Sequence, residues 1–171
     1  PKTDPEDAAF LARLLFEHRL PVAFPPPPLM RQLRTLVRLR CHVGRSLAEV
    51  RQLLRWLSIQ LNLPGPRVLR SDAARKWILA NEAKFSPAQR LYARRNLEQI
   101  LLLENQEADL DRELQSFLAA DPRLARQAAL LRTLPGVGML VAATILGETA
   151  GTERFRDGPS ISAFAGLVPW V

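Results

Sequence analysis

The chain has 171 residues, 47% of them apolar and 6% aromatic, and Leu and Arg dominate it, which excludes general disorder and favours helices over a sheet. Its formal net charge of +7 indicates a polyanionic partner, for which nucleic acid is the commonest candidate. The single cysteine, Cys41, excludes an internal disulfide framework, and with only two histidines, His18 and His42, a zinc site of cysteine and histidine ligands is implausible.

The first segment predicts a short helix followed by a spacer. Asp4 is a favourable N-cap and Pro5 suits the first helical position, so we expect a helix from Glu6 to His18. Residues 21–28 then contain five prolines. Because proline lacks an amide proton and clashes with the preceding turn, this stretch cannot be helical, and we expect an extended spacer.

Residues 29–61 carry a heptad pattern. Their apolar side chains recur at alternating steps of four and three residues over more than four heptads, which predicts a long, coiled-coil-like helix. Arg40 is the one polar member of this seam, Gly44 weakens the helix slightly, and Pro64 helps to end it. The seam consists of Leu29, Leu33, Leu36, Arg40, Val43, Leu47, Val50, Leu54, Leu57 and Leu61.

A shorter helix and a second long one follow. Residues 71–83 form an amphipathic segment in which Trp77 is an expected anchor. Ser86-Pro87 supplies the cap and the first-turn proline of the second long helix, and Asp121-Pro122 closes that helix while starting another. The second seam consists of Ala93, Asn96, Ile100, Leu103, Glu107, Leu110, Leu114 and Phe117.

Charge separates the two long helices. Residues 29–70 contain nine arginines and one acid, Glu49, whereas residues 98–121 contain seven acids and one base, Arg112. This predicts that the helices pair, within one chain or between chains, although two solvated charged faces are the alternative. Two long seams also predict a homodimer or higher homo-oligomer. Surplus arginine on the first helix suits phosphate. The candidate contacts are Arg31, Arg34, Arg38, Arg45, Arg51 and Arg55.

The most specific local motif lies at residues 131–146. A helix from Arg123 to Leu134 should stop at Pro135-Gly136 and a second should start at Gly138, which is the pattern of a helix-hairpin-helix motif. The glycines let the backbone turn tightly and let a ligand approach it. The amides that open the second helix can hold a phosphate without reading bases; the alternative is a plain tight turn. The candidate nucleic-acid-binding residues here are Arg132, Gly136, Val137 and Gly138.

Three ordered stretches resemble one family. Residues 2–8 are similar to the segment that ends the RuvC-like nuclease domain of DEDD insertion-sequence transposases, also described as bridge recombinases. Residues 134–138, with Ala142 and Ile145 after them, resemble the C-terminal transposase domain of that family. Residues 162–169 resemble the block that follows it. The resemblance therefore spans nearly the whole chain.

The resemblance implies a DNA recombinase that is guided by a structured RNA and uses four acids with Mg²⁺. The last two acids would map onto Asp4 and Asp7, whose spacing places both carboxylates on one face of a helix start, as shared metal coordination requires. A capped first turn explains the same two acids without catalysis. The family's first two acids should precede this chain, so we expect an internal fragment that holds no Mg²⁺ and is inactive alone. The family's serine nucleophile follows its Gly-Leu-Val-Pro block, so Ser160 and Ser162 do not inherit that role.

The sequence thus predicts an all-α protein with long antiparallel heptad helices and a small helix-hairpin-helix domain. The expected divisions are the tail of a RuvC-like domain at 1–20, a proline-rich spacer at 21–28, a coiled-coil region at 29–121 and a truncated helix-hairpin-helix transposase domain at 122–171. We expect DNA and a guide RNA as partners, no membrane, and a role in transposition in the bacterial cytoplasm. The alternatives are a repair-type helix-hairpin-helix module and a coiled-coil interaction protein.

Overall fold

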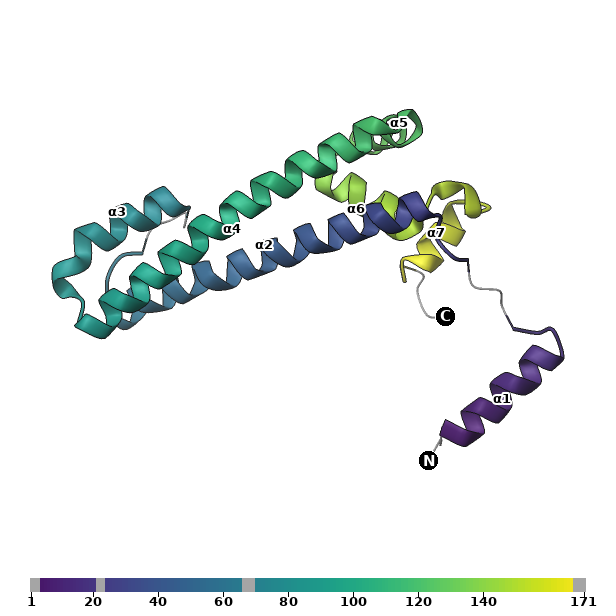
Figure 1. Ribbon diagram of the computed structural model, residues 1–171, viewed down its shortest axis with the longest axis horizontal. Coiled ribbons are helices and arrows are strands. Elements are labelled where there is room, and N and C mark those ends of the chain that lie inside the picture. Colours follow the sequence, from purple (N-terminus) through teal and green to yellow (C-terminus); the bar gives the residue numbers. More distant parts are fainter. Residues whose placement is uncertain (1–3, 21–23, 66–69, 168–171) are drawn as a thin grey trace.

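A computed structural model describes residues 4–20, 24–65 and 70–167. Within these ranges the regular elements are α-helices and two short 3-10 helices, with no strand, which confirms the all-α prediction (Figure 1). No helix in the described ranges is long and apolar enough to cross a membrane. Part of the expected spacer, at residues 21–23, and the end of the C-terminal block, at residues 168–171, lie outside the described residues.

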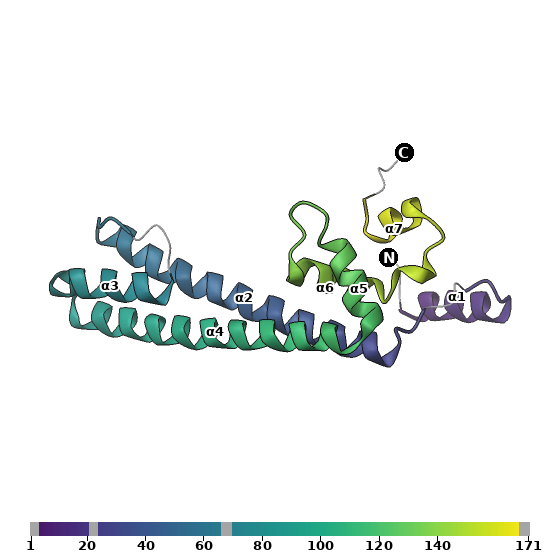
Figure 2. The same cartoon turned by 90° about the horizontal axis from the view of Figure 1, so that it is seen from above.

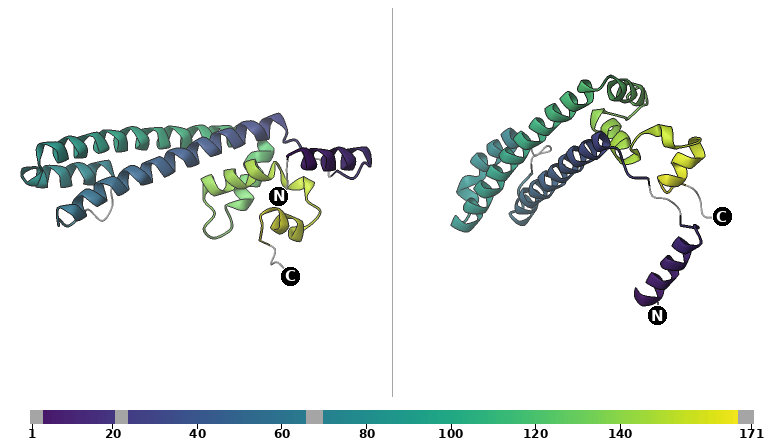
Figure 3. Two further views of the ribbon diagram at one scale, coloured as in Figure 1. Left: turned by 90° about the horizontal axis from the view of Figure 1, so that it is seen from below. Right: turned by 45° about the vertical axis from the view of Figure 1, so that its right-hand side comes forward.

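The N-terminal segment stands apart from the rest of the molecule. Helix α1 spans Asp4–Phe16, two residues earlier at each end than predicted, and buries none of its residues (Figures 1 and 3). Residues 24–27 have no regular structure, and α2 then begins at Pro28. The last proline of the predicted spacer therefore opens a helix, because the amide proton that proline lacks has no acceptor in a first turn.

Two long helices form an elongated antiparallel arm. Helix α2 spans Pro28–Gln60 and helix α4 spans Pro87–Ala120, so each is about 50 Å long (Figures 1 and 2). They pack against each other within one chain, and of the two predicted seams only Leu29 is exposed. The predicted pairing of the oppositely charged helices is therefore intramolecular. Because the seams are covered in this way, they are not the exposed surface on which the homodimer prediction depended.

The far end of the arm, called the tip below, is closed by α3 (Ser71–Asn81) and the 3-10 helix η1 (Glu82–Lys84). Trp77 is buried there with its ring centroid 5.7 Å from that of Phe85, and its indole nitrogen donates to the Pro64 carbonyl at 2.8 Å. Ser86 caps α4 reciprocally with Gln89, as the predicted start of that helix requires. The tip core consists of Leu47, Leu54, Leu57, Ala74, Trp77, Ile78, Phe85, Ala93 and Ile100.

The other end of the arm, called the base below, is covered by α5 (Pro122–Leu131) and α6 (Met139–Thr149) (Figure 2). The Asp121 carboxylate accepts the amides of Arg123 and Leu124, which confirms Asp121-Pro122 as the start of a helix. The 3-10 helix η2 (Thr152–Arg154) and helix α7 (Gly158–Phe164) follow. The base core consists of Leu33, Val37, Leu114, Leu118, Leu124, Ala128, Ala142, Ala143 and Leu146.

A polar layer separates the two cores. Arg40, the polar member of the first seam, lies 2.8 Å from a carboxylate oxygen of Glu107, the acidic member of the second, and 2.7 Å from one of Asp111. A Cβ at Gly44 would lie 3.2 Å from a guanidinium nitrogen of Arg40, so this glycine makes room for the Arg40 side chain. Burial lowers the pKa of Arg40, but the hydrogen bond with Asp111 and the two acidic charges outweigh it and raise the pKa.

Candidate nucleic-acid interface

The turn between α5 and α6 projects away from the arm (Figures 2 and 3). Helix α5 ends at Leu131, three residues earlier than predicted, and α6 begins at Met139, one residue after the predicted start. Within the turn the Val137 amide donates to the Leu134 carbonyl at 3.1 Å. Val137 packs against the base core, as expected for a residue that fills the space between two helices. The rest of the turn faces solvent.

The two glycines of the turn differ in what they require. Gly136 has a φ of +81°, in the left-handed region that side chains disfavour, so the turn itself needs a glycine there. Gly138 has a φ of −81°, which any residue adopts, so the expectation that both glycines serve the tight turn is wrong for this one. A Cβ at Gly138 would meet no described atom within 4 Å. Because Gly138 has no side chain, a ligand can approach the backbone there from solvent.

The start of α6 offers amide groups to a ligand. Gly138 is the N-cap and forms no side-chain cap, and the first intrahelical bond runs from the Ala142 amide to the Gly138 carbonyl at 3.0 Å. The amides of residues 139–141 therefore have no acceptor within the helix. They carry the positive end of the dipole of an 11-residue helix. An oxyanion such as a phosphate is the group that such a helix start binds best.

Arg132 lies beside this helix start. It is exposed, and together with Met139, the first residue of α6, it lines a shallow pocket of about 160 Å³ between α4, α5 and α6. Within the described residues Arg132 forms no ion pair, unlike Arg34 and Arg38 at the base of α2. Thus the turn combines open backbone amides with an adjacent guanidinium, which is the combination that the sequence predicted for a phosphate contact.

Two of the predicted phosphate-binding arginines hold α6 in place. Arg34 donates to the carbonyls of Gly147 and Glu148 at 3.1 and 3.0 Å, so it caps the C-terminal end of α6. Arg38 donates through two nitrogens to the Glu148 carboxylate at 2.8 and 3.0 Å. The hydrogen bond with Arg38 lowers the pKa of Glu148, burial opposes this, and the charges of both arginines add to it. Both side chains therefore have an intramolecular role that the sequence did not reveal.

The other predicted arginines divide by exposure. Arg31 and Arg45 are exposed and, with Arg38, recur every seven residues on one face of α2. The Arg45 guanidinium donates through Nε to the Cys41 carbonyl at 3.4 Å. Arg55 is exposed as well, whereas Arg51 donates to Glu104 at 2.8 Å. Because Arg38 is already paired with Glu148, Arg31 and Arg45 are the arginines of this face that are best placed for a polyanion.

The predicted metal pair lies at the exposed start of α1. Asp4 and Asp7 occupy its first turn with Glu6, where acidic side chains also complement the helix dipole. No group of three or more His, Cys, Asp or Glu residues that could hold a metal ion is present among the described residues. The Mg²⁺ role of Asp4 and Asp7 therefore stays a prediction that rests on the resemblance. No reaction step is assigned to this pair.

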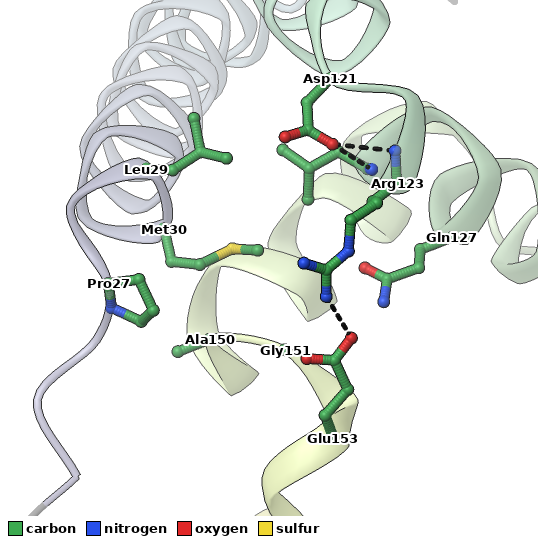
Figure 4. A pocket seen from close by; sticks show the side chains of 10 residues that line it. Pro27, Leu29, Met30, Asp121, Arg123, Gln127, Ala150, Gly151 and Glu153 are labelled. Atoms are coloured by element: carbon green, nitrogen blue, oxygen red, sulfur yellow. Dashed lines mark hydrogen bonds and ion pairs between the residues drawn. The ribbon is translucent and has the colours of Figure 1, made fainter.

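A further pocket of about 180 Å³ lies where the start of α2 meets the α4–α5 junction (Figure 4). Its floor is apolar, with Pro27, Leu29 and Met30 on one side. On the other side Arg123 extends toward Glu153, and the two form an exposed ion pair at 2.5 Å (Figure 4). Arg123 is paired with Glu153 and Asp121 adds a second acid, so the pocket lacks the surplus positive charge that a phosphate site needs.

Sequence reasoning missed Glu148, although a signal for it was present. An acid in the last turn of a helix is unfavourable because it adds to the negative end of the dipole. Glu148 occupies that position in α6, and no basic residue of α6 compensates it there. An unfavourable charge of this kind indicates a cationic partner from another element. Arg34 and Arg38, which lie more than a hundred residues away in sequence, are those partners.

The segment that carries the exposed turn also matches a known family. Residues 128–171 match the family model described as Transposase IS116/IS110/IS902 family. This match begins within α5 and runs through the turn, α6 and α7 to the end of the sequence. No curated protein matches the chain. The family match supports a transposase, and its residues include the turn and the uncapped start of α6.

Proposed function

We propose that the chain is a nucleic-acid-binding part of a DNA transposase and that the turn between α5 and α6 contacts the phosphate backbone of DNA. The observation that carries this proposal is the open start of α6 beside Arg132, inside the segment that matches the transposase family. The exposed Arg31 and Arg45 on α2 and the net charge of +7 add sequence-independent attraction to a polyanion. The family match favours this function over that of a repair-type helix-hairpin-helix module.

The finer assignment rests on the resemblance described above. We propose that the parent protein is a DEDD-type, RNA-guided recombinase of the bacterial cytoplasm, and that Asp4 and Asp7 contribute to its Mg²⁺ site together with acids from another part of that protein. A carboxylate pair in one helical turn supports this role, because it can share a metal ion with further oxygen ligands. Mg²⁺ would supply charge stabilisation at the phosphate under attack.

We also propose that the protein self-associates, through surfaces other than the covered seams. Large apolar side chains face outward along the arm, where burial against a second copy would remove them from water. They include Leu53, Trp56 and Ile59 on α2 and Leu91, Tyr92 and Leu102 on α4. Light scattering across micromolar concentrations tests this directly. A mass that stays at 19.2 kDa throughout would exclude self-association of the chain.

The phosphate contact is tested by fluorescence anisotropy with labelled duplex DNA and structured RNA over a salt series. Gly138→Val is the informative variant, because its backbone conformation suits valine and its added side chain meets no described atom. Gly158→Val is its matched control, since Gly158 also opens a helix and a Cβ there also meets nothing within 4 Å. Binding should weaken with salt, and Gly138→Val should weaken it further while the control leaves it unchanged.

Arg132→Ala provides a second readout. It should reduce the slope of log Kd against log salt by about one, because one phosphate contact is lost. If Gly138→Val binds DNA as tightly as Gly158→Val does, the turn does not hold phosphate and the proposed contact is wrong. Absence of binding even at low salt would favour the remaining alternative, a helical protein-interaction module.

A further inference from the structure

Three phenylalanine rings surround one guanidinium near the base. The Arg154 guanidinium carbon lies 4.3 Å from the ring centroid of Phe155, 4.4 Å from that of Phe164 and 5.3 Å from that of Phe24. Its Nε donates to the Thr149 carbonyl at 2.8 Å, which fixes the guanidinium at the end of α6. Phe155 and Phe164 also pack against each other, with centroids 5.3 Å apart and planes inclined by 58°. The cluster joins residues that are far apart in the sequence.

Two of these rings remain open to solvent. The exposed fraction is 48% for Phe24 and 52% for Phe164, which is high for phenylalanine. Both rings line a pocket of about 240 Å³, whose other walls are Pro26, Ala150, Arg34, Glu148 and Arg154. A ring that served packing alone would be expected to bury both faces. Here the rings instead form the walls of an accessible depression next to two guanidinium groups.

The pocket carries a net positive charge. Its one acid, Glu148, is already paired with Arg38, through two hydrogen bonds, and with Arg34. Arg38 is not part of the pocket wall, so it offsets the acidic charge from outside and leaves Arg34 and Arg154 in excess. Aromatic rings interleaved with arginine are the surface on which nucleobases stack while the backbone is held electrostatically.

We propose that this pocket, called the Phe–Arg pocket below, binds one unpaired nucleotide, with its base against Phe24 or Phe164 and its phosphate near Arg34 and Arg154. An unpaired base is required because both faces of a base within a duplex are covered by its neighbours. The ligand is a single-stranded or extruded nucleotide of DNA or RNA. The site deepens the proposed function and rests on it, but it uses residues separate from the turn at Gly138.

The test uses short single-stranded DNA and RNA oligonucleotides, each containing one 2-aminopurine, whose fluorescence falls when it stacks. Phe164→Leu removes the ring and keeps an apolar side chain, whereas Phe164→Tyr keeps the ring. Phe164→Leu should weaken single-strand binding roughly five- to hundredfold and abolish the quenching, and Phe164→Tyr should restore both. Duplex binding should change little in either variant. The stronger of the DNA and RNA arms identifies the natural source of the nucleotide.

The readouts separate this site from the turn. If Gly138→Val weakens duplex binding while Phe164→Leu leaves single-strand affinity and quenching unchanged, the pocket proposal is wrong and the proposed function stands. If Phe164→Leu lowers single-strand binding but Gly138→Val leaves duplex binding intact, the pocket is supported and the phosphate contact at the turn fails. A third outcome is faster proteolysis of residues 17–27 in Phe164→Leu with unchanged quenching. The cluster would then only fasten α1 and the lead-in to the base, and the proposal would be overturned.

Discussion

The tip and the base of the arm are held together in different ways. The tip core contains the large side chains Trp77, Ile78 and Phe85, together with leucines of α2 and Ile100 of α4. The buried residues of the base core are leucines, Val37 and three alanines, with no aromatic ring, and α6 approaches α2 so closely that a Cβ at Gly147 would lie 3.4 Å from the backbone of Arg34. Arginine side chains then bind the end of α6 from outside.

This difference indicates that the tip stabilises the arm, whereas the base positions the binding surface. Large apolar side chains stabilise the tip through the surface that they remove from water, and they need no partner beyond the chain. Small residues at the base bring backbones close together, and the Arg34 and Arg38 contacts fix the direction of α6. The start of α6, which has no side-chain cap, is thereby held beside the exposed Gly138. We expect changes at the tip to alter stability and changes at the base to alter binding.

The largest effect is expected for Trp77→Ala at the tip. This change removes a buried ring, its contact with Phe85 and the hydrogen bond to Pro64, so the free energy of unfolding should fall by about 3–5 kcal/mol. Urea denaturation followed by circular dichroism measures the loss. Duplex binding by the folded fraction should remain at the wild-type level. Weaker binding at a temperature where the variant is fully folded would show that the two ends are not independent.

Arg40→Leu tests the polar layer between the cores. The Arg40 side chain is 11% exposed, and its loss leaves Glu107 and Asp111 without their cation. We expect a loss of about 2 kcal/mol, less than for a fully buried pair because both acids keep contact with solvent. In a double-mutant cycle, adding Glu107→Leu should recover part of this loss, because Asp111 still lacks its cation. If the stability losses of the two single variants simply add in the double variant, Arg40 and Glu107 do not stabilise each other.

Gly147→Val tests the close approach at the base. Valine at this position would press on the backbone of Arg34 and on the Leu33 side chain, so we expect a loss of about 1–3 kcal/mol. Because α6 shifts with it, duplex binding should weaken as well. Gly158→Val serves again as the control, since a side chain there meets nothing within 4 Å. Calorimetry measures the stability and fluorescence anisotropy the duplex affinity of the same samples. An unchanged affinity in a destabilised variant would contradict the predicted link between the position of α6 and binding.

The smallest effect is expected for Glu148→Gln, and it should depend on pH. Arg38 lowers the pKa of Glu148 below its usual 4.5, so the folded state gains stability above that pH and loses it as the pH falls through the lowered value. The side chain is 37% exposed, and screening by solvent limits the gain to below about 1 kcal/mol. The unfolding free energies of variant and wild type should therefore differ at pH 6, and the difference should shrink as the pH falls below 4.5. A difference that stays constant with pH would show that the Arg38–Glu148 ion pair does not stabilise the base.

Local signals predicted the elements of this fold well. Heptad spacing identified both long helices, and short-range chemistry at Ser86-Pro87 and Asp121-Pro122 placed two helix starts correctly. These features depend on neighbours within one or two turns, so they can be read from the chain alone. The pairing of Arg40 with Glu107 was not predicted, although each stood out as a polar member of its seam. Which residues of two antiparallel helices face each other depends on their register, and heptad spacing leaves that open.

The candidate site was only partly predictable for the same reason. The Pro135-Gly136 dipeptide predicted the turn from composition alone. The positive φ of Gly136 explains why a glycine is needed there. By contrast, the roles of Arg34 and Arg38 depend on α6, which lies more than a hundred residues further along the chain. The Phe–Arg pocket likewise combines Phe24 with Arg154 and Phe164. A single sequence carries no local sign of such long-range contacts. From the sequence alone, Arg34 and Arg38 could not be distinguished from the exposed arginines of the same helix.

Because α2 and α4 are antiparallel, the chain runs along the arm from the base to the tip and then back to the base. The residues before Pro28 and those after Ala120 meet at the base, and the tip lies one arm length away (Figure 1). The reach of the arm can therefore vary without moving the base, provided that both helices change length together by whole heptads. Deleting one heptad from each helix between the polar layer and the tip would draw the tip about 10 Å closer and keep both seams in phase. The length of the arm therefore sets the distance between the tip and the turn that follows α5.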